Sequence, residues 1–114
     1  TKEKNFLALE KEKDLRFFLD FDESIFKKYF VESPILRIGW TSFIRNILIA
    51  SGNSKIRSLR SSVKKYLTHK EPLVRGTAVW SINKLDKFKK TELFQKLKTM
   101  EKNKYVRFEL DCLD

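Results

Sequence analysis

A five-residue motif occurs three times in this 114-residue chain and constrains its fold more than any other feature. Each copy has a polar residue, one further residue, two apolar residues and an arginine. The copies are Ser33-Pro34-Ile35-Leu36-Arg37, Glu71-Pro72-Leu73-Val74-Arg75 and Asn103-Lys104-Tyr105-Val106-Arg107. A polar residue followed by proline is a helix start signal, because proline fits the first helical position. The motif therefore predicts a helix start at each copy, with the arginines 38 and then 32 residues apart.

This spacing predicts stacked helical pairs. One helical hairpin cannot bury its apolar face alone, so neighbouring pairs pack against each other. A polar–Pro–apolar–apolar–Arg start at such a period is typical of HEAT-like repeats. The chain has only 3 glycines and 2 prolines, which disfavours a turn-rich β architecture. We therefore predict an all-α fold of HEAT-like stacked helical hairpins, an α-α superhelix of about six to seven helices with right-handed stacking.

The length of the chain predicts one domain, because 114 residues suffice for one hydrophobic core and not for two. We expect residues 1–32 to form connecting helices that lead into the repeat region. Residues 33–114 are expected to form the HEAT-like repeats. Because the chain starts at Thr1 and not at a methionine, it is interpreted as a piece of a longer protein.

Apolar spacing predicts where the helices lie. One helix is expected over 33–51 and is predicted to end at Gly52, in the left-handed conformation common just after a helix. An amphipathic helix is expected over 55–68, and a short helix over 23–31 precedes both. Further helices are expected to start near Pro72, Thr91 and Lys104. The side chains expected to face the core include Ile25, Tyr29, Leu73, Met100 and Phe108, and Cys112 is expected to be half-buried.

The positive charge of the chain is concentrated in its middle. The formal net charge is +10. Residues 33–70 hold eight basic and no acidic side chains, whereas residues 1–32 have a net charge of −1 and residues 71–114 of +3. A solvated basic surface normally has acids interspersed, so this block favours contact with a polyanion such as a nucleic acid. The candidate contact residues are Arg37, Arg45, Arg57, Arg60, Lys64 and Lys65.

Among these candidates, contact with a nucleic acid is predicted most strongly for Arg57, Arg60 and Lys64, because they recur at i, i+3 and i+7 on one helix face. Arg45 lies on an otherwise apolar helix, so a structural hydrogen bond fits it as well as a phosphate contact does. Arg75 and Arg107 have a different interpretation. In stacked repeats such an arginine ties adjacent turns together by bonding to an acid or a carbonyl.

Aromatic side chains are dense near the start of the chain. Bases stack on such side chains in single-stranded nucleic-acid complexes, but the helical spacing favours a core role, or packing against a neighbouring domain. Trp40 and Trp80 are about one repeat apart, and a core position is favoured for Trp40 too. The cluster comprises Phe17, Phe18, Phe21, Phe26, Tyr29 and Phe30.

The sequence contains no motif that predicts catalysis. It has no glycine-rich phosphate loop, no nucleophile elbow and no histidine and cysteine cluster. We therefore expect no catalytic residue, metal or cofactor in this chain. Asp20, Asp22 and Glu23 fit a helix N-terminus, and His69 fits a loop at a helix end. No apolar run reaches the about 20 residues of a membrane helix, and the single cysteine favours a reducing, cytoplasmic location.

Several blocks in the middle of the chain form a more specific pattern. They are Ser33-Pro34-Ile35 with Arg37-Ile38-Gly39, the run Phe43-Ile44-Arg45-Asn46-Ile47-Leu48-Ile49-Ala50-Ser51-Gly52-Asn53-Ser54, and Pro72-Leu73-Val74-Arg75-Gly76 with Ala78-Val79-Trp80. Phe21, Phe26 and Phe30 precede them. This pattern resembles the C-terminal HEAT-like region of epoxyqueuosine reductase over about residues 15–85.

The resemblance implies a parent oxidoreductase that reduces epoxyqueuosine to queuosine in tRNA, with cobalamin and two [4Fe–4S] clusters as cofactors. This chain lacks the family's cobalamin-binding and cysteine-rich parts, and one cysteine cannot supply the thiolates of two clusters. The resemblance therefore implies a monomeric C-terminal part that is not catalytic by itself. Its expected partners are a tRNA anticodon arm and the missing catalytic domain of the same protein.

Two other functions remain open. A stand-alone HEAT-like scaffold would bind a protein partner, with little dependence on salt. A HEAT-type DNA-binding module would bind duplex DNA as well as RNA. The acid-free block favours the nucleic-acid functions over the scaffold, and the resemblance favours RNA over DNA.

Overall fold

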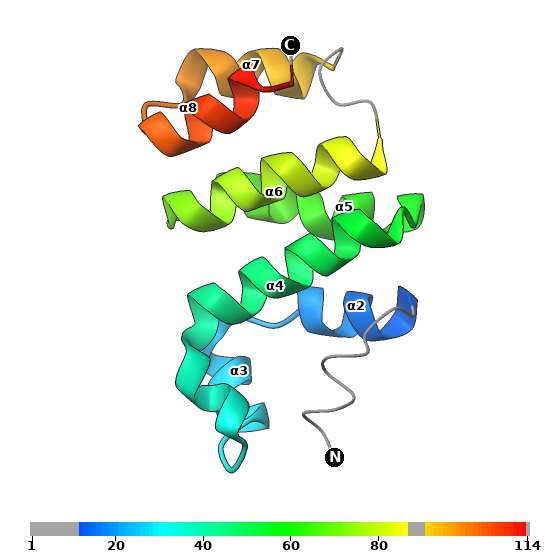
Figure 1. Cartoon of the computed structure of the whole chain (residues 1–114), viewed down its shortest axis with the longest axis vertical. Coiled ribbons are helices and arrows are strands. Elements are labelled where there is room, and N and C mark those ends of the chain that lie inside the picture. The colour runs from blue at the N-terminus through cyan, green and yellow to red at the C-terminus, as the bar shows by residue number, and fades with distance from the viewer. Residues whose placement is uncertain (1–11, 87–90, 114) are drawn as a thin grey trace.

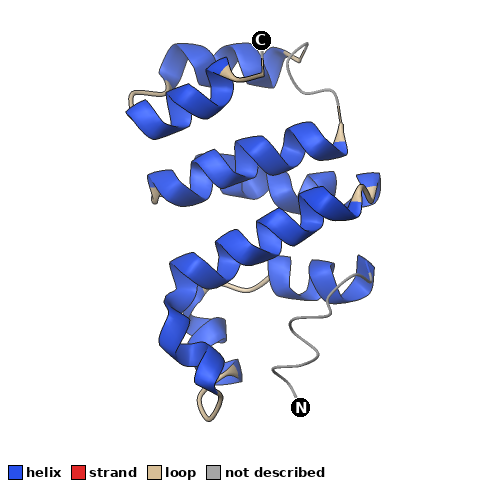
Figure 2. Ribbon diagram, in the orientation of Figure 1, coloured by secondary structure: helices blue, strands red, loops and turns tan. Residues whose placement is uncertain are grey.

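The structure, a computed structural model, describes residues 12–86 and 91–113 (Figure 1). Every regular element in these two ranges is a helix, and they contain no strand (Figure 2). The predicted all-α fold is therefore confirmed. The α-helices and the 3-10 segments (η) are α2 (Glu12–Leu19), α3 (Glu23–Tyr29), η1 (Pro34–Ile38), α4 (Gly39–Ser54), η2 (Arg57–Leu59), α5 (Arg60–Lys64), η3 (Lys65–Thr68), α6 (Pro72–Leu85), α7 (Glu92–Met100) and α8 (Lys104–Asp111).

Each copy of the repeated motif begins a helical element, as predicted. Pro34 begins η1 behind the Ser33 cap, whose hydroxyl accepts the Ile35 N–H at 3.2 Å. Pro72 begins α6. The side chain of Asn103 caps α8 by accepting two backbone N–H groups of its first turn. These caps satisfy N–H groups that have no partner within the helix.

The helix predicted over 33–51 differs from the observed one in two respects. Its first turn is the 3-10 segment η1, and the change to α4 occurs at Gly39, which has a φ of +83°. The prediction that Gly52 ends the helix is wrong, since α4 continues to Ser54 and Lys55 caps it in the left-handed conformation. Gly52 lies buried inside α4, where Trp80 of α6 packs directly on it.

The helix predicted over 55–68 is divided into η2, α5 and η3. Its predicted apolar stripe is nevertheless buried through Leu59, Val63 and Tyr66. The segment contains three serines and a β-branched valine within six residues, and these residue types favour regular α-helix weakly. Packing therefore holds the segment in place, although it is not one continuous α-helix.

The helices follow one another along the long axis of an elongated molecule with extents of 42 × 26 × 18 Å (Figure 1). α6 packs against α4 on one side and against α8 on the other, and α5 also packs against α6. α2 packs against both α4 and α5. α4, α6 and α8 thus form a layer. The second and third motifs begin α6 and α8, and the first motif begins η1, directly before α4.

The aromatic side chains near the start of the chain form one end of the core. Phe18, Phe21, Phe26 and Phe30 are buried together with Phe43 of α4, and Trp40 is also buried. Neighbouring rings lie edge-on, tilted or stacked, with the centroids of Phe26 and Phe43 4.9 Å apart. The predicted core role is confirmed for these residues. Phe17 is 49% exposed, at the rim of the cluster.

Several side chains that were expected in the core are exposed. For Ile25, Met100 and Phe108 the reason is that α3, α7 and α8 each bury a single narrow face, centred on Phe26, on Phe94, and on Val106 with Leu110. Tyr29 lies beside the rings of Phe17 and Phe18 but stays partly exposed. Leu73 is in the first turn of α6. The exposed residues are Ile25, Tyr29, Leu73, Met100 and Phe108, and Cys112, which was expected to be half-buried, is exposed as well.

Candidate nucleic-acid interface

Two of the predicted contact residues, Arg57 and Arg60, share one carboxylate. Nη2 of Arg57 donates to Oδ1 of Asp86 at 3.1 Å. Nη1 of Arg60 donates to Oδ2 of the same carboxylate at 2.5 Å. η2 and α5 supply the arginines, and Asp86 follows directly after α6. The packing of α5 on α6 therefore brings Asp86 to two arginines that lie 29 and 26 positions earlier in the sequence.

The resulting cluster, Arg57–Asp86–Arg60, keeps a positive charge, because one carboxylate cannot neutralise two guanidinium groups. The side chains of Arg57 and Arg60 are 70% and 48% exposed. Ion pairs at such exposed positions contribute little stability. Their effect here is geometric, because Asp86 holds two guanidinium groups side by side while their remaining N–H donors stay accessible. Guanidinium groups bind phosphate oxygens through such donors.

Of the other predicted residues, Lys64 and Arg37 are accessible, whereas Arg45 and Lys65 are bonded to other side chains. Lys64 is exposed in α5, next to this cluster in the chain, and no described residue bonds to its ammonium group. Arg37 is also exposed, but it lies in η1, which packs against α4 and not against α5. The structure therefore does not bring Arg37 to the cluster that Arg57 and Arg60 form.

Arg45 makes a structural hydrogen bond, which was one of its two predicted roles. Its Nε donates to the hydroxyl oxygen of Thr77 at 3.0 Å, and this hydroxyl donates to the carbonyl of Leu73 at 2.7 Å. The bond ties α4 to α6. It uses only one of the five N–H donors that a guanidinium group carries.

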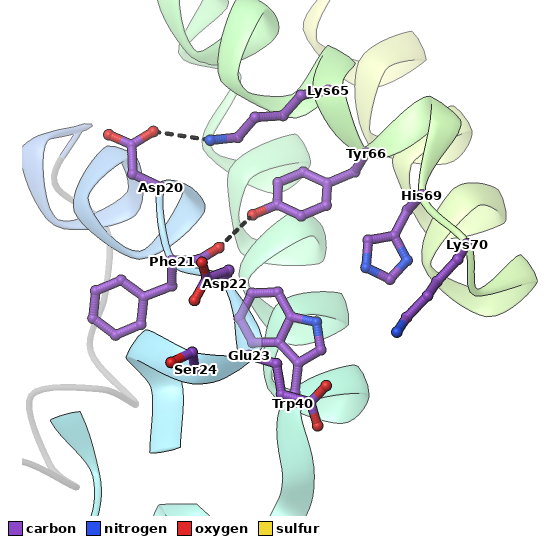
Figure 3. A pocket seen from close by; sticks show the side chains of 10 residues that line it. All are labelled: Asp20, Phe21, Asp22, Glu23, Ser24, Trp40, Lys65, Tyr66, His69 and Lys70. Carbon is purple, nitrogen blue, oxygen red and sulfur yellow. Dashed lines mark hydrogen bonds and ion pairs between the residues drawn. The ribbon is translucent and has the colours of Figure 1, made fainter. Parts of the chain in front are cut away.

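Lys65 lines a pocket of about 520 Å³ and is paired within it (Figure 3). Its ammonium group contacts Oδ1 of Asp20 at 3.0 Å. Figure 3 shows Lys65, Tyr66 and the residues after η3 on one side of the pocket and the stretch 20–24 on the other. Both signs of charge line this space, so it does not extend the cationic surface of the Arg57–Asp86–Arg60 cluster.

Two titratable rings, Tyr66 and His69, line this pocket. Burial, with the nearby Asp20 and Asp22 carboxylates, raises the pKa of Tyr66 well above its usual value. The Tyr66 hydroxyl donates to the backbone carbonyls of Leu19 and Phe21. Burial lowers the pKa of His69, whose Nδ1 accepts the Glu71 N–H at 3.0 Å. These groups hold the η3 segment against the end of α2 and the start of α6.

Two repeat arginines bind acids or carbonyls, as predicted. Arg75 makes a bidentate pair with Glu101 at 2.9 and 3.0 Å, and its Nη1 donates to the carbonyls of His69 and Lys70. Arg107 donates to the carbonyl of Glu101 at 2.9 Å. Burial alone would raise the pKa of Glu101, but the hydrogen bonds from Arg75 and from backbone N–H groups outweigh it and lower that pKa.

Sequence reasoning missed residues that only the tertiary structure brings together. Asp86 lies outside the acid-free block, yet it packs on the basic residues of that block. A second pocket of about 230 Å³, between α4, α6 and α8, is lined in part by Tyr105 and Glu109. The sequence does not predict this pocket, because the other lining residues lie 25 to 64 positions earlier in the chain.

Within the described ranges, no group of three or more His, Cys, Asp or Glu side chains is arranged to hold a metal ion. None of the helices described has the length and hydrophobicity of a membrane span. Comparisons with protein-family models, with curated proteins and with solved structures found no match to this chain.

Proposed function

We propose that this chain is the C-terminal, HEAT-like part of an epoxyqueuosine reductase, and that it contacts tRNA through the Arg57–Asp86–Arg60 cluster and the adjacent Lys64. In this proposal the chain is structural and is not catalytic by itself. Reduction of epoxyqueuosine takes place in the missing cytoplasmic parent domains, with their cobalamin and two [4Fe–4S] clusters. The pattern of residues around Ser33-Pro34 and Leu73-Val74-Arg75-Gly76 supports this assignment.

The observation that carries the RNA-binding part is the shared carboxylate of Asp86. Two arginines that were free to rotate would lose conformational entropy on binding a phosphate backbone. Asp86 reduces this loss, because each of its oxygens already fixes one guanidinium group. The cluster remains cationic and exposed, which suits a polyanion better than an apolar protein surface. An anticodon arm offers phosphates at the spacing of a folded RNA backbone.

The test is binding of a tRNA anticodon arm by the wild-type chain and by the variant Arg57→Glu/Arg60→Glu/Lys64→Glu, over a range of salt concentrations. Each phosphate contact contributes about 0.7 to 0.9 to the slope of log K against log salt. We expect the variant to bind at least about 10-fold more weakly, with a slope smaller by roughly 2 to 3. Circular dichroism checks that the variant is folded.

A matched control reverses the same number of charges elsewhere, in Lys96→Glu/Lys102→Glu/Lys104→Glu. These three lysines are exposed and lie outside the acid-free block. If both variants lose the same affinity, binding depends on net charge and the proposed site is wrong. Equal affinity for duplex DNA and RNA would instead favour a DNA-binding module, and salt-independent capture of a protein would favour a scaffold.

A further inference from the structure

We infer that the pocket between α4, α6 and α8 binds a single guanine base of a single-stranded nucleic acid. This inference rests on the proposed function, because it assigns base recognition to a chain already proposed to hold RNA phosphates. The pocket has a volume of about 230 Å³, below the roughly 300–1,000 Å³ of sites for drug-sized ligands. It therefore suits one planar ring system. Its lining residues are Arg45, Ile49, Thr77, Trp80, Tyr105 and Glu109.

Two glycines set the aromatic walls of this pocket. A Cβ atom on Gly52 of α4 would lie 2.9 Å from ring carbon Cζ3 of Trp80. A Cβ atom on Gly76 of α6 would lie 2.3 Å from ring carbon Cε2 of Tyr105. Each ring therefore lies directly on the backbone of the neighbouring helix, at a position where only glycine fits without displacement. Trp80 and Tyr105 are thus fixed aromatic surfaces, the kind on which nucleobases stack.

The two charged groups of the pocket do not neutralise each other. Arg45 and Glu109 line the same space, yet they form no ion pair with one another. Thr77 fixes the Nε end of the Arg45 guanidinium, so its two Nη groups form a fork with unused donors. No described residue bonds to the half-buried carboxylate of Glu109. The pocket therefore presents a donor fork and an acceptor pair that lack partners.

The ionisation of Glu109 agrees with this geometry. Burial raises the pKa of its carboxyl group. In the protein alone, no hydrogen bond from a described residue offsets the cost of burying the ionised Glu109 carboxylate. A ligand with N–H donors would supply the missing hydrogen bonds, and such bonds to ionised groups are among the stronger ones in proteins.

Guanine matches this pair of groups better than the other bases. Its O6 and N7 atoms accept two hydrogen bonds from one guanidinium fork, which is the commonest specific arginine–base contact. Its N1–H and N2–H groups lie on the adjacent edge and donate to a carboxylate. Adenine places the N6 donor where the arginine needs an acceptor. Cytosine and uracil do not combine a pair of acceptors for the arginine with a pair of N–H donors for the carboxylate.

Lys84 extends the site toward the nucleic-acid backbone. Its ammonium nitrogen lies 5.5 Å from the centroid of the Trp80 ring, one helical turn further along α6. The side chain is exposed. In this inference, the phosphate of a base that stacks on Trp80 lies within reach of the Lys84 ammonium group.

The experiment titrates the wild-type chain with guanosine, adenosine, cytidine and uridine 5′-monophosphates, and follows the indole N–H NMR signal of Trp80. Single-stranded tetranucleotides that differ in one central base are measured in parallel. We expect tighter binding of guanine than of the other bases, by about 5-fold to about 140-fold, as for one good bidentate base contact. Equal affinity for all four bases would overturn the inference.

The variant Glu109→Gln is expected to lose most of this preference while it keeps its weak affinity for the other three bases. Glu92→Gln is the matched control, because Glu92 is exposed on α7 and lines no pocket of this kind. An unchanged guanine preference in Glu109→Gln would contradict the assigned contact. Thermal unfolding shows whether either variant has lost its fold.

The outcomes separate this inference from the proposed function. If RNA binds without base preference and Arg57→Glu/Arg60→Glu/Lys64→Glu weakens it, the proposed function stands and the guanine pocket is wrong. If guanosine monophosphate and the tetranucleotide with a central guanine bind but the tRNA anticodon arm does not, the pocket stands and the proposed function fails. If neither binds, both are wrong, and an acidic or basic side chain of a protein partner becomes the better occupant.

Discussion

At the scale of single residues, the repeated arginine shows how far sequence reasoning reaches. Arg75 was predicted to tie adjacent turns, and it does so through Glu101 and two backbone carbonyls. The partner itself was not predictable, because Glu101 lies 26 residues away. The same holds for Arg57 and Arg60. Their position on one face followed from helical spacing, whereas Asp86 reaches them only through the packing of α5 on α6.

The Arg75–Glu101 pair predicts a pH-dependent stability. Its side chains are 19% and 9% exposed, so removing Arg75 leaves a largely buried carboxylate without its partner. We expect Arg75→Ala to lower the free energy of unfolding by about 2 kcal/mol at pH 7. The folded-state pKa of Glu101 is below its ordinary value of 4.5. The wild-type advantage is therefore complete above pH 4.5 and is lost as the pH falls through that lower pKa.

Urea unfolding of the wild type and Arg75→Ala at pH 7 and at about pH 3 measures this difference. Arg37→Ala is the matched control, because Arg37 occupies the corresponding motif position but is exposed and bonds to no described residue. The control should change stability by less than about 0.5 kcal/mol. A loss in Arg75→Ala that is equally large at both pH values would show that the Glu101 carboxylate is not the cause.

At the scale of elements, the sequence predicted where helices begin better than where they end. The start of a helix depends on a local capping residue, such as Ser33, Thr91 or Asn103, and such residues are recognisable in the sequence. Ends depend on packing. Gly52 has the sequence appearance of a helix end, but it is needed inside α4 because Trp80 packs on it. The prediction that Met100 and Phe108 face the core is wrong for a related reason. The apolar character of a residue does not show which face of its helix packs against a neighbour.

The approach of α8 to α6 gives a prediction at this scale. A methyl group at position 76 would lie 2.3 Å from the Tyr105 ring, so Gly76→Ala must displace that ring or separate the helices. We expect a loss of about 1–3 kcal/mol in the free energy of unfolding, as for overpacking of a filled core. The guanine preference of the adjacent pocket should fall as well.

Gly39→Ala is the contrasting variant. A Cβ atom at position 39 would meet no atom within 4 Å, but the φ of +83° is strained for alanine. Its destabilisation of about 1–3 kcal/mol comes from the backbone alone, and the NMR signals of Tyr105 should stay unchanged. If Gly76→Ala leaves Tyr105 and the guanine preference unaltered, the aromatic wall is not set by this glycine.

At the scale of the whole molecule, folding partly neutralises the acid-free block, because acids from other parts of the chain pack against its basic residues. Residues 33–70 contain no carboxylate, yet Asp20 pairs with Lys65 and Asp86 pairs with Arg57 and Arg60. The positive surface is therefore smaller than the block. The layer of α4, α6 and α8 was predictable from the motif period, because each motif starts one of its helices or the turn before it. The pocket within that layer was not predictable, because its lining residues come from three helices that are far apart in the sequence.

Asp86 distinguishes two ways in which the molecule could attract RNA. The variant Asp86→Asn raises the net charge by one and leaves a side chain of the same shape. If long-range attraction dominates, RNA affinity rises and its salt dependence steepens. We expect the opposite at low salt, a loss of about 2-fold to 5-fold. An amide has one acceptor oxygen and no charge, so it cannot fix both guanidinium groups, and binding must restrict them anew.

The measurement is RNA affinity at two salt concentrations for the wild type, Asp86→Asn and the control Asp20→Asn. Asp20 also pairs with a basic residue of the block, Lys65, but bonds to neither Arg57 nor Arg60. The control should bind RNA slightly more tightly than the wild type, since it gains one charge and loses no arginine orientation. The stability of both variants should change by less than about 1 kcal/mol, because these ion pairs are exposed. A gain in affinity in both variants would mean that Asp86 only reduces the charge of the surface, and that the paired arginines act without a fixed geometry.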